Sequence, residues 1–239
     1  MENVQQQPDH IVQKPSDRGL ALRGIVQVLY APAELFKKIK DTPKLLIAWL
    51  VFFVLILSFF LIAGDVITNA QLDIMKEKAV KGGQVLPQQM PTFEQMKWST
   101  IIFGSVFIML SPLIAGLLGL FFGNVVMAGR ASFKQILSVM VYGEIIYALG
   151  ALIVAPMMVA KNSVKVGFSL ATFFKDLSIQ SPLYLLLSKV GVFYIWEIIV
   201  IGIGLSIIYE FPRNKGYLLA VLSMGMISIL HVLTGLLFG

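Results

Sequence analysis

Two glutamates and one histidine interrupt long apolar stretches of this sequence. Glu144 lies in YGEIIYALG (142–150), Glu197 lies in YIWEIIVIGIGL (194–205), and His231 lies in the apolar C-terminal stretch. An ionisable side chain inside a bilayer costs roughly 2.5 to 3.5 kcal/mol on insertion scales, so such residues usually face other helices or water. We therefore interpret Glu144, Glu197 and His231 as candidate intramembrane polar contacts.

These three residues are open to two interpretations. Counted along the expected helices at the usual rise, Glu197 and His231 lie at comparable depth and could meet, whereas Glu144 has no basic partner at its own depth. In the functional interpretation they form a proton or cation relay. In the structural interpretation they make polar contacts that hold neighbouring helices in register. We favour the structural interpretation, because transporters more often show inverted repeats or several broken helices around a polar cavity.

Catalytic motifs are missing from the sequence. It contains two histidines, His10 and His231, which are expected on opposite sides of a membrane, so no H-E-x-x-H zinc motif is possible. It contains no cysteine, which excludes a thiolate metal site or a disulfide. No G-x-S-x-G turn, nucleotide-binding Gly-Lys-Ser/Thr loop or G-x-G-x-x-G motif occurs. We expect a protein that is not an enzyme and binds no metal or cofactor.

The composition is that of a membrane protein. Hydrophobic residues make up 57% of the 239 residues and charged residues 13%, about half the usual share in soluble domains. The net charge of +6 comes from scattered basic residues without a nucleic-acid-binding motif, so we expect no nucleic-acid partner. About 20 apolar residues cross a bilayer as a helix. The sequence therefore predicts an all-α bundle of five transmembrane helices, at about 45–64, 99–128, 136–160, 190–209 and 217–239.

The second of these stretches is too long for one perpendicular helix. It contains Pro112 and several glycines, which predict a kinked or tilted helix that its neighbours tolerate. All four arginines fall in segments 1–44, 129–135 and 210–216. By the positive-inside rule, these segments are expected in the cytoplasm, with the C-terminus outside.

The segments outside the five stretches are short. Residues 1–18 are polar and expected to be disordered, and residues 19–44 are expected to form a cytoplasmic interfacial amphipathic segment of one or two helices, divided at Pro32. That segment can face lipid headgroups or pack under the bundle, and the pattern does not decide between the two. Apolar residues at helical spacing in 170–177 predict a second interfacial helix on the outer side.

Small and aromatic residues supply further candidate contacts. Glycines at packing distance along a helix allow close helix contacts, inside the bundle, with a partner or between copies of the chain. The candidate packing positions are Gly119, Gly123, Gly202 and Gly204. The candidate interfacial or partner contacts are Pro32, Phe36, Lys37, Lys38, Phe133, Lys134 and Trp196.

Three motifs occur in an order and at a spacing that resemble a known family. They are VLYAPAELFKKIKDTP (28–43), GRASFKQILSVMVYGEIIYALG (129–150), and FYIWEIIVIGIGL (193–205) followed by PRNKG (212–216). Together they resemble bacterial members of the Yip-domain family (Ypt/Rab-interacting proteins). The resemblance implies five spans, a cytoplasmic N-terminus and no enzymatic activity. It also implies integral membrane partners, since some bacterial members appear beside ABC-type exporters.

The sequence thus predicts a non-catalytic accessory or scaffold subunit of another membrane complex, with an ABC-type exporter as the preferred partner and the bacterial plasma membrane as the location. Its expected partners are membrane lipids and other integral membrane proteins. One alternative is a proton- or ion-coupled transporter that uses Glu144 and Glu197. Another is a membrane-trafficking or lipid-binding adaptor that works through residues 19–40 and their lysines.

Overall fold

The chain folds into a bundle of helices. The computed structural model describes the backbone of residues 17–81 and 91–238 and the side chains of residues 22–80 and 91–229. The helices are α1 (Asp17–Tyr30), α2 (Pro32–Asp41), α3 (Leu46–Lys81), α4 (Phe93–Met109), α5 (Ser111–Leu120), the π-helix η1 (Phe121–Val126), α6 (Phe133–Lys161), the 3₁₀ turn η2 (Leu170–Phe173), α7 (Pro182–Lys189), α8 (Val192–Tyr209) and α9 (Arg213–Phe238).

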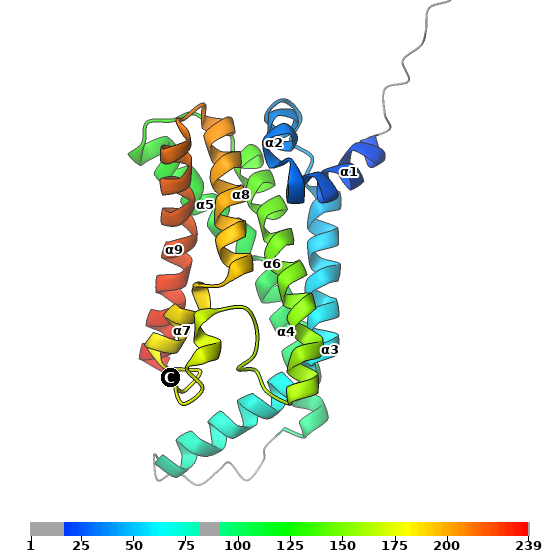
Figure 1. Ribbon diagram of the computed structural model, residues 1–239, viewed down its shortest axis with the longest axis vertical. Coiled ribbons are helices and arrows are strands. Elements are labelled where there is room, and N and C mark those ends of the chain that lie inside the picture. The colour runs from blue at the N-terminus through cyan, green and yellow to red at the C-terminus, as the bar shows by residue number, and fades with distance from the viewer. Residues whose placement is uncertain (1–16, 82–90, 239) are drawn as a thin grey trace, which may run out of the picture.

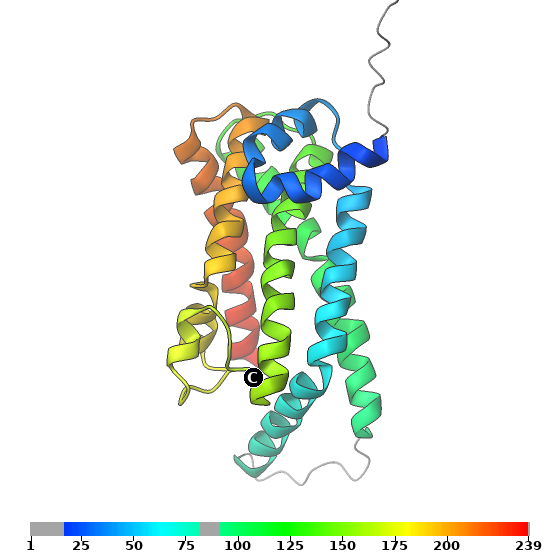
Figure 2. The same ribbon diagram turned by 45° about the vertical axis from the view of Figure 1, so that its right-hand side comes forward.

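The long helices run side by side along the long axis of the molecule (Figures 1 and 2). Helix α6 is central, because most of its residues are buried, and it packs against α3, α5 and α8. Helices α8 and α9 form a tight hairpin, and α3 pairs with α4. Helices α1 and α2 lie across one end of the bundle and α7 lies at the other. We refer to these as the α2 end and the α7 end.

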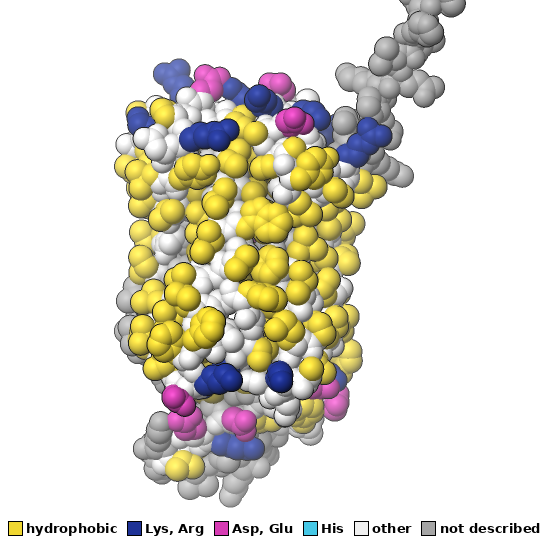
Figure 3. Space-filling view, viewed as in Figure 1, with side chains coloured by type: hydrophobic (Ala, Val, Ile, Leu, Met, Phe, Trp, Pro, Cys, Tyr) yellow, Lys and Arg dark blue, Asp and Glu magenta, His cyan; other side chains and the backbone are white. Residues whose placement is uncertain are grey.

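The bundle has the dimensions and surface of a membrane protein. In the described part of the chain, four helical stretches are long and apolar enough to cross a bilayer, namely Leu46–Val80, Phe93–Val126, Phe133–Lys161 and Val192–Tyr209. Helix α9 covers the fifth predicted stretch. Figure 3 shows apolar side chains around the middle of the bundle, with charged side chains gathered at its two ends. The predicted all-α membrane bundle is confirmed.

The second long stretch is broken where the sequence predicts a kink. Helix α4 ends at Met109, and α5 begins at Ser111 with Pro112 in its first turn. Proline lacks an N–H and its ring clashes with the preceding turn, so a continuous helix is unfavourable here. The Ser111 hydroxyl donates to the Ile108 carbonyl oxygen at 2.8 Å and satisfies one acceptor at the break.

Helix α3 runs further than the first predicted span. That span ends at 64, but the helix continues to Lys81 and bends away from the bundle at the α7 end (Figure 2). Asp65 marks the change, because its carboxylate pairs with the Lys97 ammonium of α4 at 2.7 Å. An ion pair at this level indicates where α3 and α4 leave the apolar band.

The prediction of a helix over 170–177 is wrong. Only the single 3₁₀ turn η2 forms there. The backbone at this point pairs with another segment, since the Leu170 N–H donates to the Val190 carbonyl and the Val192 N–H donates to the Phe168 carbonyl. The helix of this loop is α7 instead, which Ser181 caps by accepting from the Tyr184 N–H at 3.2 Å.

The N-terminal segment forms two helices that meet at Pro32. The apolar face of α2 (Leu35, Phe36 and Ile39) is buried, and α2 packs on α8. Helix α1 instead exposes Leu22, Val26 and Tyr30. Packing under the bundle therefore describes α2, while α1 presents apolar side chains outward. Of the segment 1–18 expected to be disordered, residues 1–16 lie outside the described residues.

An ion pair between Lys40 and Glu210 ties the end of α2 to the turn between α8 and α9. The hydrogen bond from Lys40 lowers the pKa of Glu210 below its ordinary value. A depressed carboxyl pKa contributes stability above the unfolded-state pKa, and this contribution is lost as the pH falls through the lower folded-state value. We therefore expect α2 to loosen from the turn as the pH falls below about 4, the ordinary range for glutamate.

This expectation can be checked by spin-label distance measurements, since the chain contains no cysteine to interfere. With labels at Lys37→Cys and Asn214→Cys, the distance distribution should be narrow at neutral pH and broaden under acid. Glu210→Gln should give the broader distribution at both pH values. A Glu210→Gln variant that keeps the full acid response would contradict the assignment to this pair.

Candidate functional site

Glu144 and Glu197 line the same cavity inside the bundle. The cavity has a volume of about 450 Å³ and is lined by residues of α4, α5, α6, α7, α8 and α9. Most of its wall is apolar, including Phe107, Leu185 and Ile227. Its polar lining consists of Ser111, Glu144, Tyr147, Ser188, Lys189, Tyr194, Glu197 and Ser228. The fold therefore joins two acids that lie 53 positions apart in the sequence.

Glu144 faces the break between α4 and α5. Its side chain is buried, and its Oε1 lies 2.8 Å from the Ser111 hydroxyl oxygen. That hydroxyl also lies 2.8 Å from the Ile108 carbonyl oxygen. A serine hydroxyl has one proton to donate. The Ser111 hydroxyl can donate to one of these oxygens at a time, and both Glu144 Oε1 and the Ile108 carbonyl oxygen lie within its reach.

Glu197 is buried without a hydrogen-bond partner. Its side chain is 1% exposed, and its Oε1 makes no hydrogen bond within the described residues. A buried polar group left unpaired costs about 1–3 kcal/mol, and most buried polar atoms in native proteins avoid this cost. Such a group inside an apolar bundle points to a ligand or proton that completes its interactions.

Lys189 supplies a positive charge to the same cavity. It is the last residue of α7, and it interacts electrostatically with both Glu144 and Glu197. Its ammonium lies 5.4 Å from the centre of the Tyr194 ring, within the range of a cation–π contact. Two carboxylates and one ammonium leave one excess negative charge when all three are ionised. One proton or one monovalent cation neutralises the site.

The wall between α8 and α9 is held by hydroxyl groups. The Tyr194 hydroxyl lies 3.0 Å from Ser228 Oγ, and Ser228 donates to the Met224 carbonyl oxygen at 3.1 Å. The side chain of His231 lies outside the described residues, so its predicted contact with Glu197 stays a prediction.

Sequence reasoning did not single out Ser111, Lys189 or Tyr194 as site residues. The pattern Ser181-Pro182 before an apolar run with a final lysine is a helix-start signal. It would have placed Lys189 at the end of a short helix next to the fourth span.

The four candidate packing glycines all lie inside the bundle. A Cβ at Gly119 would lie 2.9 Å from Met140, and one at Gly123 would clash with the ring of Tyr209. Gly202 faces Tyr217 of α9 in the same way.

Gly204 faces Val139 of α6 and Phe36 of α2. These glycines allow close contacts between helices of one chain.

The remaining candidate contacts have varied surroundings. Pro32 begins α2, Phe36 is fully buried, and Phe133 packs near Gly116. Lys37, Lys38 and Lys134 are exposed. Trp196 is half-buried and stacks on Phe193, with ring centres 6.5 Å apart.

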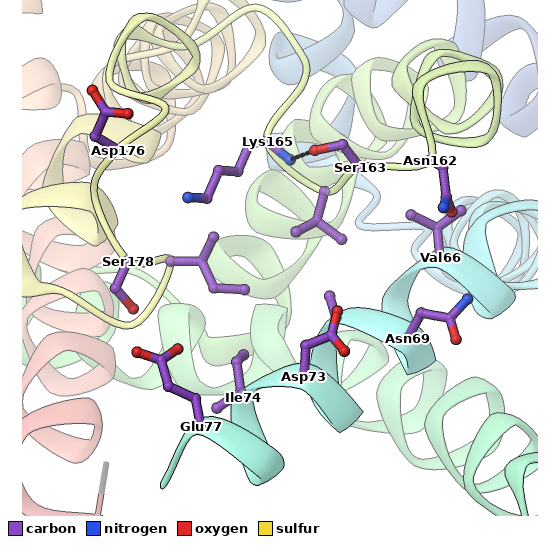
Figure 4. A pocket seen from close by; sticks show the side chains of 13 residues that line it. Val66, Asn69, Asp73, Ile74, Glu77, Asn162, Ser163, Lys165, Asp176 and Ser178 are labelled. Atoms are coloured by element: carbon purple, nitrogen blue, oxygen red, sulfur yellow. Dashed lines mark hydrogen bonds between the residues drawn. The ribbon is translucent and has the colours of Figure 1, made fainter. Parts of the chain in front are cut away.

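A second cavity, of about 460 Å³, lies between the far end of α3 and the loop before α7 (Figure 4). Asp73, Glu77 and Asp176 line it together with Lys165. The Lys165 ammonium donates to the carbonyl oxygens of Lys175 and Leu177 at 2.6 and 2.7 Å, so this lysine holds the loop in place. No group of acidic or histidine residues suited to a metal ion occurs among the described residues.

The fold, with its long apolar helices, defines a polytopic helical membrane protein. Comparison with known protein families identifies its family, since the Yip1 domain model matches residues 26–236. The chain belongs to the Yip1 domain family, which confirms the family found in its motifs; the match does not bear on the bacterial branch of the family. No curated protein and no solved structure matches the chain significantly.

Proposed function

We propose that this Yip1 domain protein is a non-catalytic membrane protein that binds and releases a proton, or a monovalent cation in its place, between Glu144 and Glu197. The observation that carries the proposal is the buried Glu197 carboxyl, which shares a cavity with Glu144 and has no hydrogen-bond partner within the described residues. Two acids and one lysine around a single cavity support the proton- or ion-coupled alternative over a purely structural role for the two glutamates.

The two carboxyl groups belong to different helices, which gives proton binding a mechanical consequence. Glu144 is on α6 and Glu197 is on α8, and the two helices approach closely where Gly143 faces Ile201. With both acids ionised, their repulsion favours separation of α6 from α8 and attraction of Lys189 on α7. A bound proton or cation removes the excess charge and favours the close arrangement. Occupancy and helix position are linked because each state binds the cation with a different affinity.

The cavity also has a route to its surroundings. Phe107 of α4 lines it and is 73% exposed, so the wall at this point separates the acids from the membrane by one side chain. At the α7 end Lys189 lines the cavity. We further propose, from the arginines of the α2 end, that this end faces the cytoplasm, which places Lys189 on the outer side.

Proton flux into vesicles tests this function directly. The reconstituted protein, with a pH-sensitive dye trapped inside the vesicles and a potassium ionophore to clamp the voltage, should dissipate an imposed pH difference. Repeating the measurement with a sodium gradient shows whether a metal cation takes the place of the proton. Glu197→Gln should reduce the flux at least tenfold, because the neutral amide cannot carry the proton.

Glu94→Gln is the matched control, since Glu94 is an exposed glutamate at the start of α4. It should leave the flux unchanged. Wild-type flux in Glu197→Gln, or no flux in the wild-type protein under any of these gradients, would contradict the proposal.

The accessory role beside an exporter is a hypothesis that rests on the family resemblance. Helices α3 and α4 turn most of their side chains away from the rest of the bundle, which leaves room for lipid or for helices of another protein. Stoichiometric co-purification with exporter subunits in mild detergent is the measurement that checks it.

A further inference from the structure

A cavity of opposite charge lies at the α2 end of the bundle. It has a volume of about 340 Å³ and lies between α1, α2 and the central helix α6. Its polar lining includes Arg23, Gln27, Lys38, Asp41, Lys44 and Tyr142. Three bases and one acid line the cavity, so basic side chains outnumber acidic ones in its wall.

Two of these bases make no ion pair within the described residues. Arg23 lies on α1 and Lys38 on α2, and neither appears in an ion pair there. Lys40, two positions further on α2, is different because it pairs with Glu210 and does not line the cavity. Basic side chains from two helices that line one cavity predict an anionic ligand.

Tyr142 of α6 supplies an independent indication of a ligand. Its side chain is 2% exposed, and its hydroxyl makes no hydrogen bond within the described residues. The hydroxyl lies under α1, where a Cβ at Gly24 would be 3.0 Å from it. Because Tyr142 lines the basic cavity, its hydroxyl is a donor available to an acceptor there.

We propose that Arg23, Lys38 and Tyr142 form a binding pocket for a phosphate group at the membrane surface. A phosphate offers several acceptor oxygens, which suit the forked donors of an arginine, the point charge of a lysine and one hydroxyl. The pocket lies at the α2 end of the bundle, and α1, which contributes Arg23 to it, exposes the apolar Leu22 and Val26. A phospholipid can reach it with its acyl chains against α1, and a soluble phosphate can reach it from water.

Titration of the full-length protein with phosphatidylglycerol tests the pocket, with bound lipid counted by native mass spectrometry in a phosphate-free detergent. Arg23→Gln and Lys38→Gln should each weaken binding about fivefold, as expected for one basic residue near an anionic lipid. Tyr142→Phe should weaken it about two- to tenfold through loss of one hydrogen bond. Inorganic phosphate is titrated in a parallel series, and binding of the lipid or of the ion identifies the source of the phosphate group.

Lys37→Gln is the matched control. Lys37 is exposed on the same helix, one position from Lys38, and lies outside the cavity, so the same charge change should leave binding as in the wild type. Thermal unfolding of each variant shows that it is folded. If Lys37→Gln weakens binding as much as Lys38→Gln, the attraction is spread over the surface and the pocket is overturned. Absence of binding of both the lipid and inorganic phosphate overturns it as well.

Discussion

Gly216→Ala is expected to lower the free energy of unfolding by about 3 kcal/mol, because the added methyl group overpacks the contact between α8 and α9. A Cβ at Gly216 would lie 2.5 Å from the carbonyl oxygen of Gly202 and 2.9 Å from the backbone nitrogen of Ser206. These are backbone atoms of α8 and cannot rotate away as a side chain would. The two helices must therefore separate, and the tight hairpin loosens.

The effect can be measured by unfolding the protein in mixed micelles with increasing dodecyl sulfate. Gly225→Ala is the control in the same helix, since a Cβ there meets nothing within 4 Å. Alanine has the higher helix propensity by up to about 1 kcal/mol, so this variant should be as stable as the wild type or slightly more stable. Equal losses for Gly216→Ala and Gly225→Ala would show that the close approach of α8 and α9 does not limit stability.

Glu197→Met is expected to raise the free energy of unfolding by about 1–3 kcal/mol while it abolishes proton exchange. The methionine side chain has a similar length and removes an unpaired buried polar group from a wall that already contains Met224 and Ile227. A residue kept for function at a cost in stability behaves in this way. Proton uptake is measured with a dye in detergent, and stability in the same mixed-micelle titration as above.

The opposite sign of the stability change separates the two interpretations of Glu197. If Glu197 only holds α8 in register, Glu197→Met should destabilise the protein, and the stability change should have the opposite sign to the one expected here. Glu144→Gln is the companion variant, since its amide oxygen can still accept a hydrogen bond from Ser111 and its stability should change little. Loss of proton uptake in Glu144→Gln with unchanged stability would show that both acids share the exchangeable proton.

Local features of the chain were predictable from the sequence. The lengths of the apolar stretches, the break near Pro112 and the division of the N-terminal segment at Pro32 depend on residues close together in the sequence. The helix predicted over 170–177 failed because its backbone pairs with residues about 20 positions away, and periodicity does not report such a partner.

The sequence by itself determined that this is a helical membrane bundle with ionisable residues inside its apolar stretches, because bilayer thickness and the cost of buried charge act on every apolar stretch separately. Only the tertiary structure decided that Glu144, Glu197 and Lys189 line one cavity, and that α2 packs on the bundle while α1 exposes an apolar face. Which faces of the helices meet depends on contacts between side chains far apart in the sequence, such as Gly204 with Phe36. Those contacts exist only when the helices are packed together.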